Sequence, residues 1–570
     1  MRNPKATLHA ALRVTAAAAV GAALVLHMAS GVRTASPRFY DDDPIWVDDD
    51  RAEDASGVQP WILADEYLAY ESTLKDPGEE TRDVRAQNLN TIDEVPDSSW
   101  FTNRIGRETL TPADVTRGVC ETEGPLPGNW VVSEGKVEGD QLGFTITDTA
   151  GIRWFVKFDP PGYPEMATGA EVVVSRLLWA LGYNVPEYHV AYVKREQLTV
   201  GEGALVQPPG AYTRQMREKD LDLLFKYAPR LPDGRARVVA SRALVGAPLG
   251  PFRFSGTRPD DPNDIVPHEH RRELRGLLVF SAWLNHVKAQ ASNTLDTLVR
   301  DADRAYVRHN LLDFGSTLGS GGVRPQDYGA GHEYLVDPKR SLKRLAALGF
   351  AIDDWRTVPL HETESVGRLP RDGDAWDPGQ WKPQYSNAAF RRVRADDRFW
   401  AARKVMGMTD ELIKGAVKAG QYTDADAEAF LVTTLTARRD AIGRAYLPAI
   451  NPVVDPALDS SGTLTFRNAA VDAGVAPPPA RYRAQWARFD NATGETQAIG
   501  ESSGPATGIM APAGLPAGEG TYVRVGIAAA PGTGTAWETP LHAYFRRTAT
   551  GWMLVGLERL PETTLASSAK

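Results

Sequence analysis

The feature that most constrains this chain is a pair of polar motifs that flank a short predicted β-hairpin. The first motif holds His286 and Asn293 and follows a strongly apolar helical pattern. The second, Asp313-Phe314-Gly315, ends the apolar run YVRHNLL, where a carboxylate without a partner would be costly to bury. Between them, TLDTLVR and AYVRHNLL, joined by the turn DADR, predict two strands. The sequence therefore predicts a helix, a polar loop, a hairpin and an acidic turn in succession.

Length and composition bound the architecture and exclude some functions. At 570 residues the chain is too long for one hydrophobic core, so several domains are expected. A formal net charge of -9 argues against non-specific nucleic-acid binding, and we expect no nucleic-acid partner. The single cysteine, Cys120, excludes an intramolecular disulfide and any metal site with several cysteine ligands.

Residues 1–35 have the pattern of a signal peptide or membrane anchor. A basic start precedes residues 14–26, an uncharged run that is too short for a comfortable transmembrane helix. The small residues that follow would suit signal peptidase, with cleavage after Gly31 or, as the weaker option, after Ala35. We therefore expect an exported protein that is periplasmic, extracellular or anchored to the membrane by this segment.

The next segment, residues 36–125, is a mixed N-terminal extension. Its acidic start, residues 36–60, predicts extended or disordered chain. The run WILADEYLAYESTL predicts a helix. The run NLNTIDEVPDSSWFTNRIG contains a proline, paired serines and two aromatic residues, and it predicts an ordered loop on the surface.

Residues 126–205 have the pattern of three strands, a helix and a further strand. NWVVSEGK, LGFTITDT and IRWFVKFD predict the first three strands. Apolar residues at helical spacing over residues 170–181, followed by Gly182, predict the helix, and NVPEYHVAYV predicts the last strand.

The rest of the chain divides into a helical and a β-rich part. Helical patterns dominate residues 206–450, and Thr409 and Thr423 are candidate N-caps of two of the helices. Residues 451–570 instead contain short alternating segments such as ARYRAQWARF and LHAYFRR, separated by Pro- and Gly-rich turns, with a hairpin tip at residues 548–551. This pattern predicts a small all-β, sandwich-like domain.

A buried ion pair is predicted in the first of these regions. Lys157 lies in the apolar strand WFVKF, where an unpaired ammonium is costly, although an exposed strand edge is an alternative. Glu171 on the following helix is preferred as its partner over Glu165, which precedes the helix. Gly139 and Gly143 lie between the first two strands or near them, where they could bring backbone amides close to an anion or simply form turns.

Oxygen ligands for a hard cation are predicted around the hairpin. Asn293 and Asp313 offer an amide and a carboxylate oxygen, as Mg²⁺ prefers, and Asp296 is a weaker reserve ligand. Alternatively, Asp313 only caps a turn. His268 and His270 look metal-like, but they do not share a helix face, and a solvated helix start is the preferred interpretation.

These motifs, in this order, resemble those of the protein-kinase-like superfamily, and within it the atypical bacterial branch of HipA-like and spore-coat-type kinases. The resemblance covers roughly residues 126–450 and rests on FVKFDPPGYPEMATGAEVVVSRLLWALGYNVPE and on RRELRGL, WLNH, the loop asparagine and DFG. It implies an α+β, two-lobed kinase-like core, with residues 126–205 as the N-lobe and 206–450 as the C-lobe, and an interlobe cleft for ATP or another nucleoside triphosphate with Mg²⁺ or Mn²⁺. The implied roles are nucleotide binding for Lys157, Glu171, Gly139 and Gly143, metal binding for Asn293 and Asp313, and catalysis for Lys288 and His286.

The sequence departs from the family pattern at Lys288. This residue stands where a kinase has the loop aspartate that accepts the proton of the substrate hydroxyl. A lysine can accept that proton only if its pKa falls by several units, and a bound nucleotide would push its pKa the other way. Lys288 could instead contact the γ-phosphate. Three alternatives follow: no transfer, transfer by positioning alone, or a base supplied by His286 or Asp296.

Two functions are therefore expected. The first is an exported atypical kinase-like protein that transfers a phosphoryl group to an unknown protein or small-molecule acceptor. The alternative is an inactive pseudokinase that acts as a binding or scaffold protein of the cell envelope and recognises a protein or glycan through the C-terminal β domain. A cluster of Lys157, Glu171 and Asp313 beside an open cleft favours the first, and a large separation of Lys157 from Asp313 favours the second.

Overall fold

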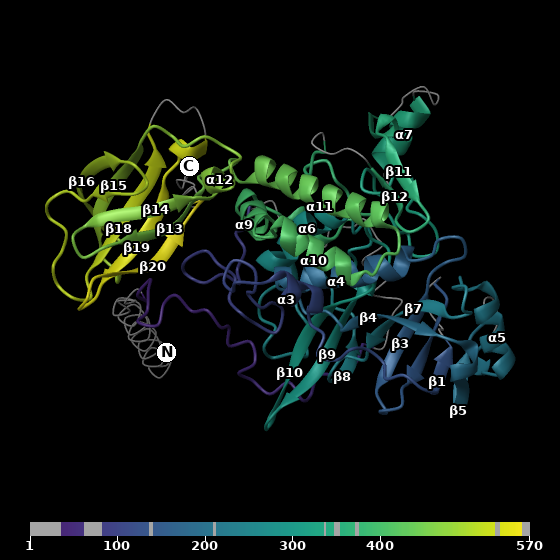
Figure 1. The fold of residues 1–570 in the computed structure, drawn as a ribbon. Helices are drawn as coiled ribbons and strands as arrows, with labels where there is room; N and C mark the ends of the chain where they lie inside the picture. Colours follow the sequence, from purple (N-terminus) through teal and green to yellow (C-terminus); the bar gives the residue numbers. More distant parts are fainter. Residues whose placement is uncertain are drawn as a thin grey trace, which may run out of the picture.

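The computed structural model describes residues 36–61, 83–135, 141–208, 212–335, 338–346, 354–370, 376–530 and 536–560. Within them the protein is mixed α+β, with several separate sheets and a group of packed helices (Figure 1). The predicted signal segment lies outside these residues, as does nearly all of the helix predicted in WILADEYLAYESTL. No helix in the described ranges is both long and apolar enough to cross a membrane.

A seven-stranded sheet contains all the strands predicted in residues 126–205. Its strand order is β4-β7-β3-β2-β1-β5-β6, so β3 lies between β2 and β7. The sheet extends past residue 205, where the lobe boundary is predicted, because β6, a helix and β7 follow that residue and β7 separates β3 from β4. The elements are β1 (Trp130–Gly135), β2 (Gly143–Thr147), β3 (Arg153–Phe158), α4 (Met166–Leu181), β4 (Tyr188–Val193), η1 (Arg195–Gln197), β5 (Leu198–Val206), β6 (Arg214–Gln215), α5 (Glu218–Tyr227) and β7 (Ala236–Arg242).

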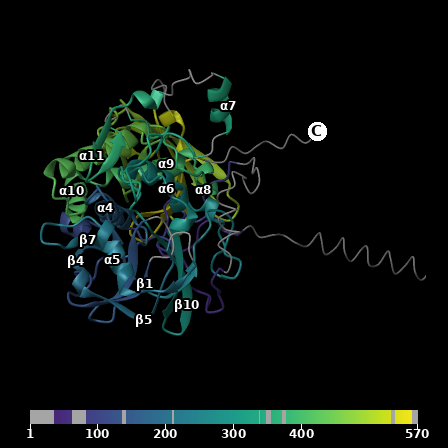
Figure 2. The same cartoon turned by 90° about the vertical axis from the view of Figure 1, so that its right-hand side faces the viewer.

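Packed helices lie above this sheet, with α4 between them and the strands (Figure 2). The side chains of α4 and of the helices above it form one large hydrophobic core. Thr409 caps α10, as predicted, and its side chain accepts a hydrogen bond from the Leu412 amide. Thr423 does not cap α11, because Asp424 takes that place. The helices are α3 (Pro112–Arg117), α6 (Arg272–Leu284), α8 (Ala388–Arg391), α9 (Ala395–Met406), α10 (Asp410–Ala419) and α11 (Ala425–Tyr446).

The predicted hairpin is present and is joined by a third strand. Strands β9 and β10 pair antiparallel from Thr294 opposite Leu311 to Asp301 opposite Arg304. Strand β8 pairs with the other edge of β9. These and the smaller elements nearby are β8 (Ala247–Gly250), η2 (His268–His270), η3 (Ala291–Asn293), β9 (Thr294–Asp301), β10 (Arg304–Leu311), α7 (Pro338–Ala346), η4 (Asp354–Thr357), β11 (Leu360–Thr363) and β12 (Gly367–Pro370).

The C-terminal part of the chain is β-rich, as its alternating pattern predicted. A three-stranded sheet of order β13-β14-β17 and a five-stranded sheet of order β16-β15-β18-β19-β20 share one hydrophobic core. The hairpin tip predicted at residues 548–551 joins β19 to β20. The elements are β13 (Val453–Leu458), β14 (Thr463–Asn468), α12 (Ala469–Asp472), β15 (Tyr482–Phe489), β16 (Thr496–Gly504), β17 (Ile509–Met510), β18 (Tyr522–Ala529), η6 (Ala536–Glu538), β19 (Leu541–Arg547) and β20 (Trp552–Glu558).

One prediction for the N-terminal extension holds in part, and another is wrong. Residues 36–60 form no helix or strand, in line with the extended alternative, but they are not disordered, because Phe39 packs between aromatic side chains of the C-terminal sheet and Val58 packs beside β8. The run NLNTIDEVPDSSWFTNRIG is ordered but not a surface loop, since Val95 and Phe101 are fully buried in the main core. Sparse apolar residues in a polar segment gave no signal of these distant partners.

The same buried loop carries a carboxylate that joins three parts of the chain. Asp93 lies 2.6 Å from an Arg85 nitrogen, 3.0 Å from one of Arg272 and 3.6 Å from one of Arg559. Burial alone would raise the pKa of Asp93, but Arg272, Arg85 and Arg559 lower it to about 2. The extension, α6 and the end of β20 therefore meet at one buried negative charge.

Arg272, at the start of α6, extends this network into α9. Its Nη2 lies 3.0 Å from Asp396, and its Nε lies 3.1 Å from Asp397. Arg275, one turn later on α6, reaches the other Asp397 oxygen at 3.2 Å. These side chains are almost fully buried, so each charge needs its partners to remain in the interior.

We expect Asp93→Ala to lower the free energy of unfolding by about 3–5 kcal/mol, because it leaves buried guanidinium groups without their counter-charge. The pKa of Asp93 is depressed to about 2 in the folded protein. Its ionised carboxylate therefore stabilises the fold fully above the unfolded-state pKa of about 3.9, and this stabilisation is lost as the pH falls towards 2. Denaturant unfolding of wild type and variant between neutral and acid pH measures both effects. Asp410→Ala removes a half-exposed partner of Arg439 and should cost less than about 1 kcal/mol. A small loss of stability that is equal in both variants would contradict the role of Asp93 as the counter-charge of the buried guanidinium groups.

Candidate functional site

The structure brings Lys157, Glu171 and Asp313 together. Lys157 comes from β3, Glu171 from α4, and Asp313 directly follows β10. The Lys157 ammonium lies 3.3 Å from each carboxylate oxygen of Glu171 and 2.6 Å from Asp313 Oδ1. Glu171 is fully buried, Lys157 is 16% exposed and Asp313 is 49% exposed, so the cluster runs from the interior to solvent.

The geometry also decides between the two acids weighed as partners of Lys157. Glu165 turns away and accepts hydrogen bonds from the Thr423 amide at 2.9 Å and the Thr423 hydroxyl at 2.7 Å. Glu165 therefore joins α4 to the start of α11, and Glu171 faces the lysine. Helical side-chain direction was sufficient to predict this choice.

Burial and charge oppose one another in this cluster. Burial disfavours the ammonium form of Lys157, but Asp313 and Glu171 overcome it and raise its pKa. Burial raises the pKa of Glu171, and the Lys157 charge opposes that rise. The lysine is therefore a fixed cation held between one buried and one accessible carboxylate.

The Asp313-Phe314-Gly315 turn is held from behind. The Phe314 amide donates to Glu171 Oε1 at 3.0 Å, and the Phe314 ring packs edge-on against Tyr188 on β4. The Asp313 amide lies 3.4 Å from the Tyr188 hydroxyl. Tyr188 was missed in the sequence, because an aromatic residue in an apolar strand carries no signal of this contact. A Cβ at Gly315 would lie 2.7 Å from Glu171 Oε2, so a larger residue there would displace that carboxylate.

His286 lies in the core behind this turn. It follows Asn285, which ends α6 in the left-handed conformation, and its ring packs against Phe314. The side chain is buried, and burial, partly offset by Asp313, lowers the pKa of His286 to about 4. A neutral, buried imidazole at this place holds the turn in position rather than facing solvent beside Asp313.

Asn293 and Lys288 belong to one compact loop. The Asn293 amide nitrogen donates to the Lys288 carbonyl at 2.9 Å, which leaves the Asn293 side-chain oxygen as its candidate metal ligand. The Asn293 carbonyl accepts from the Leu312 amide at 2.9 Å, so the loop runs beside the residue before Asp313. Lys288 borders a cavity of about 370 Å³ that Ser316 also lines.

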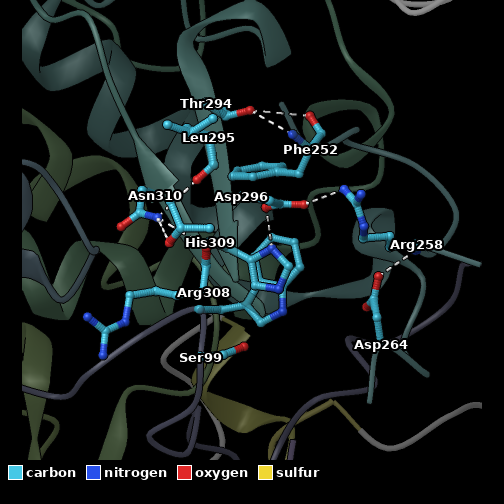
Figure 3. A network of polar contacts seen from close by, with 12 residues as sticks. Ser99, Phe252, Arg258, Asp264, Thr294, Leu295, Asp296, Arg308, His309 and Asn310 are labelled. Carbon is cyan, nitrogen blue, oxygen red and sulfur yellow. Dashed lines mark hydrogen bonds and ion pairs between the residues drawn. The ribbon is translucent and has the colours of Figure 1, made fainter. Parts of the chain in front are cut away.

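Asp296 does not belong to this site, although it was predicted as a reserve ligand or base. It is 1% exposed, and its two oxygens are bound to His309 Nδ1 at 2.7 Å and to Arg258 Nη1 at 3.1 Å (Figure 3). The His309 ring also stacks on Trp100. The β9–β10 register sets Asp296 opposite His309, and this pairing commits it to a structural network.

The histidine pair in VPHEHRRE is buried, so its interpretation as a solvated helix start is wrong. His268 Nε2 lies 2.7 Å from Asp264, and His270 Nδ1 lies 2.7 Å from an Arg275 nitrogen. The Asp264 carboxylate also contacts the Arg271 guanidinium at 3.3 Å. These contacts explain the two imidazoles as interior hydrogen-bonding groups.

The two glycines proposed for an anion site have different outcomes. Gly139 lies outside the described residues. Gly143 lies in β2 rather than in a turn, directly opposite Lys157 of β3. A Cβ at Gly143 would lie 2.3 Å from the Val156 carbonyl oxygen, so the close approach of the two strands requires glycine.

Comparisons with known proteins give little beyond this geometry. No protein-family model matches the sequence, and no curated protein matches it. Among solved structures, the chain is similar to the crystal structure of the Helicobacter pylori proinflammatory kinase CtkA, at 12% identity and a TM-score of 0.27. The match covers 54% of this chain and 93% of that one.

We expect Gly315→Ala to destabilise the protein by about 1–3 kcal/mol, because the new methyl group would displace the Glu171 carboxylate from a packed site. Thermal or denaturant unfolding measures the change. Gly57→Ala is the matched control, since a Cβ at Gly57 meets nothing within 4 Å. If the two variants were equally stable, the turn would not be tightly held against Glu171.

Proposed function

We propose that this protein is an exported, atypical kinase-like protein that binds a nucleoside triphosphate, such as ATP, with Mg²⁺ or Mn²⁺. Its two-lobed core would consist of the seven-stranded sheet and the packed helices, followed by a C-terminal β-sandwich. The observation that carries the proposal is the placement of Lys157 between Glu171 and Asp313. A lysine, its buried acid and an accessible aspartate are the groups that kinase-type phosphoryl transfer needs around the nucleotide phosphates.

The exposures of the three side chains suit nucleotide binding. Glu171 is buried and would keep Lys157 in place, whereas Asp313 is half exposed and is able to exchange its lysine contact for a cation. The Lys157 ammonium could then donate to phosphate oxygens. Asp313 and Asn293 provide the carboxylate and amide oxygens that would hold Mg²⁺ or Mn²⁺, and the ion would neutralise phosphate charge.

Phosphoryl transfer would have to proceed without an ordinary general base. Of the two substitutes weighed from the sequence, His286 is buried behind Phe314, and Asp296 is bound to His309 and Arg258. Lys288 borders the cavity beside the loop and offers a positive charge to a phosphate or to an acceptor. Transfer to a protein or small-molecule acceptor would then depend on positioning and electrostatics, and it should be slow.

The burial of His286 and the engagement of Asp296 by His309 and Arg258 also favour a second candidate function. In that case the protein would be a pseudokinase that binds nucleotide weakly or not at all. It would act as a scaffold of the cell envelope, with the C-terminal β domain recognising a protein or a glycan.

Nucleotide binding is tested by thermal shift with ATP, with and without Mg²⁺ or Mn²⁺. Ligand at about 100 times its dissociation constant should add about 2.7 kcal/mol of stability. Asp313→Ala should weaken this metal-dependent gain, because it removes a candidate ligand and a partner of Lys157. Asp327→Ala removes an exposed acid on the neighbouring cavity and serves as the control. An equal gain of stability with ligand in wild type and both variants would reject Asp313 as part of the nucleotide site. No gain of stability in wild type would favour the scaffold function.

The role of Lys288 is tested by measuring transfer rate and nucleotide affinity in Lys288→Asp. If the missing aspartate limits catalysis, the variant should gain up to about 10²–10⁴-fold in rate without tighter nucleotide binding. If Lys288 instead holds the γ-phosphate, the variant should bind nucleotide more weakly, because it adds a like charge. Robust wild-type transfer that collapses in the variant would make Lys288 a working catalytic residue.

A further inference from the structure

Away from the site around Lys157, three side chains of metal-ligating type meet. Cys120, Glu187 and His189 each offer one ligand atom, and these atoms lie within 4.8 Å of one another. Cys120 follows α3 in the N-terminal extension, whereas Glu187 and His189 lie at the start of β4. A sulfur, a carboxylate oxygen and an imidazole nitrogen thus converge from two distant parts of the chain.

The backbone holds the three groups in place. Residues two apart on a strand point to the same face, so Glu187 and His189 face Cys120 while Tyr188 faces the Asp313 turn. The Cys120 sulfur lies 3.6 Å from the Tyr188 carbonyl, and His189 Nε2 lies 2.9 Å from Glu187 Oε1. The Thr122 amide and hydroxyl also bind Glu187 Oε1.

We propose that Cys120, Glu187 and His189 form a binding site for a divalent transition-metal ion, with Zn²⁺ as the best match. Zinc accepts sulfur, nitrogen and oxygen ligands at about 2.0–2.3 Å, which sets tetrahedral ligands roughly 3.5 Å apart. Side-chain movements of about 1 Å would bring the present atoms to that spacing. The hard ions expected at Asp313 and Asn293 prefer oxygen ligands only, so the two sites differ in chemistry.

A fourth coordination position would open towards solvent. Cys120 and His189 line a cavity of about 890 Å³ between α10 and the segment that includes α3. Three protein ligands and an open position are typical of zinc sites that bind water or a small ligand. The cavity therefore gives the ion a route of entry and room for an exchangeable ligand.

Two arginines lie beside the proposed ligands, and one of them contacts a proposed ligand atom. Arg242 contacts the other carboxylate oxygen of Glu187, Oε2, at 3.1 Å. Arg242 also lies 3.7 Å from the exposed Glu121 carboxylate, which provides an alternative partner when Glu187 binds the ion. Arg176 is held by the carbonyls of Thr116 and Tyr188, and its additional hydrogen bond to the Cys120 thiol is the contact that a bound ion would replace.

The site is tested by titrating the full chain with Co²⁺, whose thiolate complexes give a near-ultraviolet charge-transfer band. We expect one equivalent of Co²⁺ to produce this band and Zn²⁺ to displace it. Cys120→Ser should abolish the band, and His189→Gln should weaken Zn²⁺ binding by at least about 10–100-fold, since even the loss of a group that only supports a ligand has that effect. Glu411→Gln, which removes a charge from the same cavity, should leave the affinity within about twofold.

No charge-transfer band in wild type, or Zn²⁺ affinity unchanged in both ligand variants, would overturn the proposal. Because Cys120 is the single cysteine, a second measurement needs no variant. Zn²⁺ should slow alkylation of the native protein by iodoacetamide at least about tenfold, because a metal-bound thiolate is shielded. Equal alkylation rates with and without Zn²⁺ would also overturn it.

Discussion

The buried guanidinium of Arg272 is the constraint on which the rest of this structure depends. Its three carboxylate partners, Asp93, Asp396 and Asp397, come from the extension and from α9. A charge in the interior is tolerated only when its partners surround it, so the loop around Asp93, α6 and α9 must take fixed relative positions. Helix α6 is thereby fixed at its first turn, and its last turn leads into the loop that holds Lys288 and Asn293.

The position of the candidate site depends on that arrangement. The Asp313 turn follows β10, and β10 is positioned by its register with β9, which begins directly after Asn293. From the other side, Tyr188 and Glu171 contact the turn from β4 and α4. The Asp313 turn is therefore supported from two sides, by the β9–β10 hairpin and by the side chains of β4 and α4.

Local sequence patterns predicted many of the helices, strands and pairings described above. The features that they did not predict depend on contacts between distant parts of the chain. The hairpin followed from alternation, and the pairing of Lys157 with Glu171 followed from an apolar strand and the direction of helical side chains. The burial of Asp296 could not be predicted, because it depends on the strand register and on Arg258. Strand β7 was missed because it joins the sheet between two earlier strands. The nucleotide, metal and catalytic roles remain predictions.

The contact between Asp93 and Arg559 has a consequence for the order in which the protein can be assembled. Synthesis starts at the N-terminus, so Asp93 is made early, and its third arginine arrives only at the end of the last strand. Until then the loop of residues 88–106 lacks one of the charges that favour its burial, and the core around it is incomplete. We therefore expect the burial of this loop to be completed only after the segment that follows β20 has been made.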